Sequence, residues 1–398
     1  MIFTPWQGNH NHQPKLSVMM LGFRGFPGVQ GGVESHMENL CPLLVQGGVA
    51  VTAIVRNRYM KKIPLTAWKG VTLTSIWAPR SIYLEALVHS FLGVIVAAFR
   101  RPDVLHIHGI GPALVTPFAR LLRLRVVVTH HGPDYDREKW GALARRILRI
   151  GESFGMHASH RRIAISRSVE ALVKERYGKA CAVIPNGIRL PDIPSTSERL
   201  AAFRLVPGRY VLTVGRLVPE KRQHDLIAAF TRAHHPGWKL AIVGDFDHVN
   251  PYADRLAQLA AETPDVVLTG FQTGETLREL FAHAGLFVLP SSHEGLPIAL
   301  LEALSYGLPV LASDIRANLE IGLRENGYFP VTDVDALAIA LESRINKPPY
   351  DEEERNVQRR WVAQRFDWDD IAYQTMAVYR DLTRVRRQKF WDTLRPSK

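Results

Sequence analysis

The sequence predicts an α/β protein made of two doubly wound domains that face each other across a cleft. Short apolar runs such as Leu16–Leu21, Val51–Val55 and Tyr210–Val214 alternate with amphipathic helical stretches, which is typical of parallel sheets covered by helices on both faces. The 398 residues also exceed the roughly 250–300 that one hydrophobic core supports. Finally, residues 1–190 carry 25 Lys and Arg against 10 Asp and Glu, whereas residues 191–398 carry 25 against 28.

The boundary between the predicted domains lies between Pro185 and Arg209. Proline, serine and threonine gather in this stretch, as is usual in a linker, and the change in charge falls at the same place. The first domain is therefore expected at residues 1–190 and the second at residues 205–370. Because ligands of open parallel sheets bind at the carboxyl ends of the strands, functional residues are expected in the loops that follow strands.

Composition excludes several classes of protein. Hydrophobic residues at 46% and charged residues at 22% are close to a globular average. Two cysteines, Cys41 and Cys181, are too few for a disulfide scaffold, and both are expected to pack as small apolar groups. Met1–Pro14 lacks the basic start and apolar stretch of a signal peptide. The apolar segment Phe91–Phe99 is far shorter than the ~20 residues of a spanning helix, so a cytoplasmic location is expected.

The first motif is a glycine-rich loop after the first predicted strand, with glycines at positions 22, 25, 28, 31 and 32. Its spacing matches neither the dinucleotide fingerprint nor the Walker loop. A flexible turn would explain it, but glycines that precede an amphipathic helix let backbone N–H groups approach an anion. Phosphate contact at Gly31 and Gly32 is therefore the favoured interpretation.

The second motif, which begins at Gly215, places Arg216 and Lys221 between a predicted strand and a predicted helix. Arginine offers a planar fork of donors and lysine a compact charge, and together they suit a diphosphate. A solvated basic turn is an equally good interpretation of this motif taken alone.

The third motif runs from Glu294 through Gly295, Leu296 and Pro297 to Glu302, with apolar residues between the two acids. Proline suits the first turn of a helix. Carboxylates beside an apolar helix need polar partners, and the hydroxyl groups of a sugar or ribose would provide them. The alternative, two solvated acids on a helix surface, fits the apolar sequence less well.

With these motifs the chain resembles the retaining glycosyltransferases of GT-B fold, family 4 (glycosyl transferases group 1). The resemblance includes Glu294-x7-Glu302, Gly31-Gly32-x-Glu34, Gly215-Arg216 with Lys221, Pro185-Asn186-Gly187 and Phe366-Asp-Trp368, in the family's order. Asp136-Arg-Glu-Lys139-Trp140 further resembles a rhamnosyltransferase-like branch. The resemblance implies two Rossmann-like domains, the first holding the acceptor and the second the nucleotide-sugar donor, with a helix over about 375–398 crossing back to the first.

The resemblance also implies roles for individual residues. Arg216 and Lys221 would bind the diphosphate, Glu294 the donor sugar and Glu302 the ribose. His131 stands where the family often places a histidine facing the donor sugar, although His130 precedes it and either ring could face the cleft. The remaining substrate-binding positions implied are Gly31, Gly32, Asn186, Gly215, Gly295 and Leu296.

The function implied is transfer of a sugar from a nucleotide-diphosphate sugar to a saccharide or lipid-linked acceptor, in bacterial polysaccharide or cell-envelope synthesis, without cofactor or metal. Alternatives are a sugar-nucleotide epimerase of the same fold and a non-catalytic nucleotide-sugar binder. The Glu294-x7-Glu302 pattern favours transfer over the epimerase, and intact Arg216, Lys221, Glu294 and Glu302 argue against a non-catalytic binder. Nucleic-acid binding is not expected, because the chain lacks a recognition motif and interleaved aromatic residues.

Two patterns invite a metal interpretation. Asp245-Phe-Asp247 is similar to the metal motif of a different glycosyltransferase fold, but loop acids are the better interpretation in a GT-B enzyme. His106-x-His108 with His130 and His131 matches no recognised ligand spacing. We therefore expect strand-end histidines that line a cleft, and no metal.

The basic excess of the first half predicts contact with an anionic membrane surface. The cations gather in two stretches, which contain Arg120, Arg123 and Arg125, and then Arg145, Arg146, Arg149, Arg161 and Arg162. Three of them, Arg145, Arg146 and Arg149, lie on one predicted helix beside apolar Leu143, Ile147 and Leu148. Peripheral binding at the inner face of the cytoplasmic membrane would suit a lipid-linked acceptor.

Overall fold

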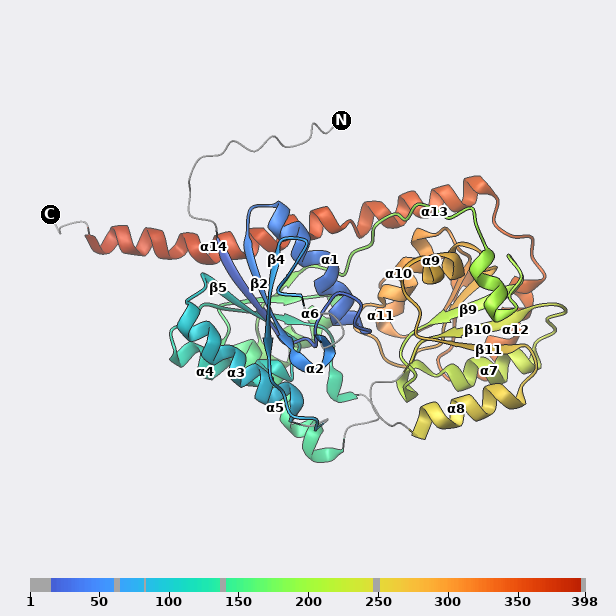
Figure 1. Cartoon of the computed structure of the whole chain (residues 1–398), viewed down its shortest axis with the longest axis horizontal. Helices are drawn as coiled ribbons and strands as arrows, with labels where there is room; N and C mark the ends of the chain where they lie inside the picture. The colour runs from blue at the N-terminus through green and yellow to red at the C-terminus, as the bar shows by residue number, and fades with distance from the viewer. Residues whose placement is uncertain (1–15, 61–64, 82–83, 137–140, 246–250, 395–398) are drawn as a thin grey trace.

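The computed structural model describes residues 16–60, 65–81, 84–136, 141–245 and 251–394. These residues form two parallel sheets, each with helices on both faces, in two lobes that lie side by side (Figure 1). The predicted class is confirmed, because both domains are α/β and doubly wound. The leader Met1–Pro14 lies outside the described residues.

The first sheet has eight strands among the described residues, in the order β3-β4-β2-β1-β5-β6-β7-β8, and only β3 is antiparallel to its neighbour. The strands are β1 (Ser17–Leu21), β2 (Ala50–Arg56), β3 (Ala67–Trp68), β4 (Val71–Ile76), β5 (Val104–His108), β6 (Val126–His130), β7 (Arg161–Ala164) and β8 (Ala182–Val183). The helices are α1 (Gly32–Gln46), α2 (Asn57–Met60), α3 (Glu85–Arg100), α4 (Thr116–Leu121), α5 (Ala142–Ala158) and α6 (Arg167–Tyr177).

The second sheet has six described strands, all parallel, in the order β11-β10-β9-β12-β13-β14. Its strands are β9 (Tyr210–Val214), β10 (Lys239–Val243), β11 (Val266–Gly270), β12 (Leu286–Leu289), β13 (Val310–Ser313) and β14 (Tyr328–Phe329). Its helices are α7 (Gln223–Arg232), α8 (Pro251–Glu262), α9 (Gly274–Ala282), α10 (Ile298–Ser305), α11 (Arg316–Leu319), α12 (Val334–Ile345) and α13 (Glu352–Arg365). A 3-10 turn, η4 (Pro219–Lys221), follows β9.

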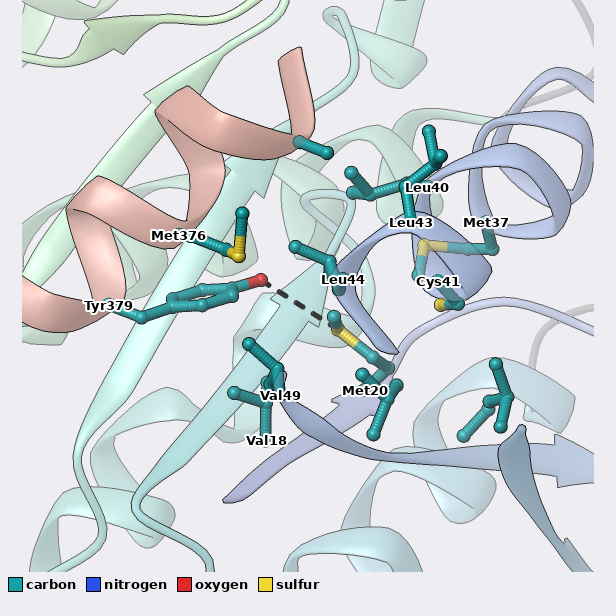
Figure 2. Packing of buried hydrophobic residues seen from close by; sticks show 14 of the residues in the cluster. Val18, Met20, Met37, Leu40, Cys41, Leu43, Leu44, Val49, Met376 and Tyr379 are labelled. Carbon is teal, nitrogen blue, oxygen red and sulfur yellow. Dashed lines mark hydrogen bonds between the residues drawn. The ribbon is translucent and has the colours of Figure 1, made fainter. Parts of the chain in front are cut away.

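The last helix, α14 (Trp368–Leu394), leaves the second domain and packs on the first (Figure 1). Met376 and Tyr379 lie against α1 and the strand residues Val18 and Met20, as Figure 2 shows. The Tyr379 hydroxyl is hydrogen-bonded to Nδ1 of His106, 2.6 Å away. Each large apolar side chain buried here contributes about 1.5–3 kcal/mol, so α14 ties the two domains together.

The helix α3 contains the apolar segment noted in the sequence. Val94 and Ala97 are fully buried against the sheet, whereas Phe91 and Phe99 are exposed. The helix is therefore amphipathic and lies on the domain. Among the described helices, none combines the length and apolar character that crossing a bilayer requires.

Part of the basic excess of the first domain is neutralised within the fold. Arg125 pairs with Asp103 at 3.1 Å, and Arg161 pairs at 2.7 Å with Asp381 of α14. The Arg161 partner comes from the acidic half of the chain, so the charge of this arginine is paired within the fold. On α5, in contrast, Arg145, Arg146 and Arg149 are exposed.

Replacing Ile371 with alanine is expected to lower the free energy of unfolding by about 2–4 kcal/mol, because the change leaves a cavity between α14 and the first domain. The matched control is Tyr373→Ala on the same helix, where the side chain is 62% exposed and the loss should stay below about 0.5 kcal/mol. Urea denaturation followed by fluorescence measures both. Equal losses in the two variants would contradict the packing role of α14.

Candidate active site

The two domains meet through backbone at the carboxyl ends of their sheets. A Cβ atom added to Gly295 would lie 2.1 Å from the carbonyl oxygen of His131, and one added to Gly132 would lie 3.0 Å from the Cα atom of Gly295. Gly132 also has a φ of +115°, which side-chain-bearing residues rarely adopt. Only glycine therefore permits this approach of the loop after β12 to the loop after β6.

Asn186, in the connection between the domains, holds the same junction. Its buried amide donates from Nδ2 to the carbonyl of Leu296 at 3.0 Å, and its Oδ1 accepts from Nδ1 of His36 at 2.9 Å. Burial lowers the pKa of His36 to about 4, so this ring is a neutral donor. The predicted substrate-binding residues Asn186, Gly295 and Leu296 thus lie together at the domain boundary.

A second contact between the domains involves Glu320, which follows α11. Its carboxylate accepts hydrogen bonds from the backbone N–H groups of Arg167 and Ser168, the latter at 3.0 Å. These residues form the first turn of α6, so an acid of the second domain caps a helix of the first.

The glycine-rich loop is held by an ion pair that the sequence analysis did not identify. Glu34 accepts from the backbone N–H of Arg24 at 3.0 Å and from its Nε at 3.1 Å. Burial opposes ionisation of Glu34, but Arg24 prevails and lowers the pKa to about 2. A Cβ at Gly31 would lie 2.0 Å from the Glu34 carboxylate, whereas none of the described atoms lies within 4 Å of one at Gly32. Gly31 therefore accommodates the ion pair, and Gly32 borders open space.

Lys221 and Glu294 form a partly buried ion pair at 2.5 Å, with 20% and 11% of their side chains exposed. Burial alone would raise the pKa of the Glu294 carboxyl, but the Lys221 ammonium beside it outweighs this effect and holds the pKa below its ordinary value. The backbone N–H of Ser292 donates to the carbonyl of Glu220 at 2.9 Å. The loops after β9 and β12 are thus joined, and the predicted diphosphate-binding cation and sugar-binding acid lie side by side.

Arg216 follows Gly215 at the end of β9 and is half-buried. Gln223 donates from its Nε2 to the Arg216 carbonyl at 2.9 Å and accepts from the Tyr252 hydroxyl at 3.0 Å. The backbone N–H of Gly215 donates to Val243 of the neighbouring strand at 2.9 Å. The turn that carries Arg216 is thus fixed to β10, to α7 and to α8.

Glu302 lies in α10, which begins immediately after Pro297 and ends before Gly307. Leu300 and Leu301 on the same helix are fully buried. Glu302 itself is half-buried, and burial raises the pKa of its carboxyl to about 7. Among the described residues none donates a hydrogen bond to this carboxyl, which is therefore available to hydroxyl donors of a ligand.

The structure separates the two adjacent histidines. His130 is fully buried, with Nε2 2.7 Å from Oε1 of Glu152 on α5 and Nδ1 accepting from the Gly132 N–H at 3.0 Å. His131 is half-buried beside Gly295, and its Nε2 lies 3.1 Å from Nδ1 of His108. His131, rather than His130, is therefore the ring at the domain boundary.

The metal interpretations receive no structural support within the described ranges. No group of three or more histidine, cysteine, aspartate or glutamate side chains with metal-binding geometry occurs there. Asp245 is described, but its companion Asp247 lies outside the described residues. His106 and His108 instead bond to protein groups, so the strand-end pattern indicates a hydrogen-bond network.

Comparisons with known proteins agree with this geometry. The family described as "Glycosyl transferases group 1" matches residues 203–361, and "Glycosyltransferase Family 4" matches residues 30–190. The chain is 31% identical over 303 residues to a glycogen synthase of Mycobacterium tuberculosis, covering 72% of this chain and 71% of the relative.

Two further likenesses extend over more of the chain. It is 27% identical to a GDP-mannose:cellobiosyl-diphosphopolyprenol alpha-mannosyltransferase of Komagataeibacter xylinus, over 80% of this chain and 78% of that protein. The solved structure of a sucrose-phosphate synthase from Thermosynechococcus elongatus is 21% identical, with a TM-score of 0.80 over 93% of this chain and all of that one.

Two α/β domains whose strand ends meet across glycines, together with these family matches and relatives, identify a glycosyltransferase of GT-B fold. The chain belongs to the glycosyl transferases group 1 family.

The raised pKa of Glu302 predicts a pH-dependent stability. The folded protein holds a proton on Glu302 up to about pH 7, whereas the unfolded chain releases it near 4.5. The stability that the protonated Glu302 contributes to the folded state is therefore fully present below about pH 4.5 and is lost as the pH rises through 7. Because Glu302→Gln cannot ionise, its free energy of unfolding should exceed that of the wild type by a margin that grows with pH. Urea titrations across this range measure the margin, and parallel pH curves would contradict the assignment.

Proposed function

We propose that the protein is a retaining, family 4 glycosyltransferase that moves a sugar from a nucleotide-diphosphate sugar to a saccharide or lipid-linked acceptor. The Lys221–Glu294 pair beside the Gly132–Gly295 contact carries this proposal. A phosphate-binding cation and a hydroxyl-binding carboxylate in direct contact match the two sides of a sugar–phosphate bond.

The charges of the site suit the cleavage of that bond. Positive charge develops at the anomeric carbon and negative charge on the departing diphosphate. Lys221, Arg216 and the first-turn N–H groups of α10 can stabilise the diphosphate, and Gly32 leaves room for its approach to the loop backbone. Cationic side chains thus take the role for which other transferases use a metal ion, and activity should persist in EDTA.

The remaining positions complete the donor site. Glu302, whose carboxyl has no described hydrogen-bond donor, would accept from the ribose hydroxyls, and Glu294 and His131 would contact the sugar. The acceptor hydroxyl would approach from the first domain on the face that the diphosphate leaves and give its proton to the departing phosphate oxygen, which retains the configuration. The mannosyltransferase relative, whose name gives GDP-mannose as donor and a diphosphopolyprenol-linked sugar as acceptor, supports both substrate classes.

Replacing Arg216 or Lys221 with alanine is expected to lower turnover at least about tenfold, because each cation stabilises charge that develops in the transition state. Arg216→Lys should lower turnover as well, since lysine lacks the planar fork of donors that arginine offers the diphosphate. The assay measures release of nucleoside diphosphate from a panel of nucleotide sugars with saccharide and lipid-linked acceptors.

The control is Arg232→Ala, which removes an exposed cation of the same domain that pairs with exposed Asp335 and should leave turnover unchanged. Wild-type turnover in both Arg216→Ala and Lys221→Ala would overturn the diphosphate assignment. Loss of activity in EDTA, restored by manganese or magnesium, would overturn metal independence.

A peripheral location on an anionic membrane is also proposed, and α5 supports it. Leu143, Ile147, Ile150 and Phe154 are 73%, 42%, 40% and 41% exposed and recur at helical spacing. The exposed cations Arg145, Arg146 and Arg149 accompany them. Leu148, expected on this surface, instead is half-buried and approaches Gly111. Apolar side chains flanked by arginines are typical of helices that lie at a lipid interface.

Binding to vesicles that contain phosphatidylglycerol should be tight at low salt and weaken at high salt, because each cation near the surface contributes about 1 kcal/mol. Changing Arg145, Arg146 and Arg149 together to Glu should abolish it. The control changes Arg209, Arg232 and Arg255 of the second domain to Glu, an equal change of charge on another domain. Co-sedimentation measures binding, and equal binding to neutral vesicles, or equal losses in both triple variants, would contradict the proposal.

A further inference from the structure

Four histidines of the first domain form a cluster that includes His131 of the candidate site. His106 and His108 are on β5, His131 follows β6, and His36 is on α1. Adjacent ring centroids are 4.0 Å apart for His106 and His108, 5.3 Å for His108 and His131, and 5.2 Å for His36 and His131. So dense a group cannot carry several positive charges, and burial together with the neighbouring rings keeps the pKa values of His108 and His131 well below the ordinary value.

Two of the neutral rings are engaged by protein groups at fixed positions. His106 contacts the Tyr379 hydroxyl through Nδ1 and the Thr129 hydroxyl through Nε2. His36 donates from Nδ1 to Asn186, because the amide nitrogen of Asn186 is already used toward Leu296. The remaining hydrogen bond, between Nδ1 of His108 and Nε2 of His131, contains a single proton.

The surroundings of His108 decide which ring carries that proton. Nε2 of His108 is buried and has no hydrogen-bond partner among the described residues. If His131 donated, His108 would carry its own proton on this Nε2, which would leave a buried N–H group unsatisfied. If His108 donates from Nδ1, its Nε2 is a bare lone pair. Orphaned buried N–H groups are rarer than unsatisfied acceptors, so the second arrangement is favoured.

The consequence appears at the opposite nitrogen of His131. A neutral imidazole that accepts at Nε2 must carry its proton at Nδ1. Nδ1 of His131 makes no hydrogen bond with a described residue, and it is not among the buried polar atoms that lack a partner. It is therefore accessible at the domain boundary beside Gly295.

We propose that His108 is a positioning residue that fixes His131 as its Nδ1–H tautomer, so that His131 donates a hydrogen bond to an oxygen of the bound donor sugar. The proposal rests on the proposed function for the identity of that oxygen, but the tautomer itself belongs to the free protein. A neutral donor also suits the reaction, because an imidazolium would oppose the positive charge that develops at the anomeric carbon.

The first test is nitrogen NMR of the free, full-length protein labelled with ¹⁵N-histidine, with His131→Gln to assign the resonances. Wild-type His131 should show a protonated Nδ1 and an unprotonated Nε2. In His108→Phe, which cannot donate, the two tautomers of His131 should mix. In His108→Asn, whose Nδ2 occupies the place of the imidazole Nδ1, the wild-type pattern should return. A protonated Nε2 on His131 in the wild type would overturn the proposal, whatever the variants do.

The second test is turnover of the three proteins with an active nucleotide sugar. His108→Phe should lower kcat about tenfold and change KM for the donor less than about twofold, because a hydrogen bond used in the transition state is lost. His108→Asn should recover most of kcat. Equal losses in both variants, with equal thermal stability, would indicate a merely structural role. If no nucleotide sugar is turned over by the wild type, the proposed function fails, while the NMR result still decides the tautomer.

Discussion

The contact between Gly295 and the His131–Gly132 peptide sets how near the two domains can stand. A single Cβ atom at Gly295 would lie 2.1 Å from a carbonyl oxygen, so any side chain there would push the second domain away. The catalytic candidates lie on both sides of this contact. His131 comes from the first domain, and Lys221 and Glu294 come from the second. Their relative positions therefore depend on backbone packing and would be lost with a small displacement.

Three features hold the domains in this arrangement. Asn186 joins α1 to the loop before α10, Glu320 caps α6 from the other domain, and α14 buries residues such as Ile371 and Tyr379 in the first core. The first two are hydrogen bonds at the boundary, which domain opening would break. The third is extensive apolar burial, which opening need not disturb. The structure thus combines extensive apolar burial along α14 with a few polar contacts at the domain boundary.

The two domains contribute different kinds of polar group to the site. The second domain contributes a paired cation and acid, with a further acid at Glu302 whose pKa burial raises to about 7. The first domain contributes neutral imidazoles at its boundary, and Glu34 of its glycine-rich loop is paired with Arg24. The cations proposed to bind the diphosphate, Arg216 and Lys221, both belong to the second domain, while the first presents uncharged imidazoles. This asymmetry agrees with a donor bound by one domain and an acceptor by the other.

The sequence by itself determined the class of fold and marked Arg216, Lys221, Glu294 and Glu302 as candidate site residues after the predicted strands. These follow from local pattern, because strand runs, helix periodicity and turn glycines act over a few positions. Which side chains meet was decided only by the tertiary structure. His108 finds His131 across two strands, Glu320 reaches α6 across 152 positions, and Arg161 finds Asp381 across 220. The pattern His106-x-His108 was visible in the sequence, but its hydrogen bonds to Tyr379, Thr129 and His131 form only when β5, β6 and α14 pack together. The partner of a side chain in space is selected by packing and not by spacing along the chain.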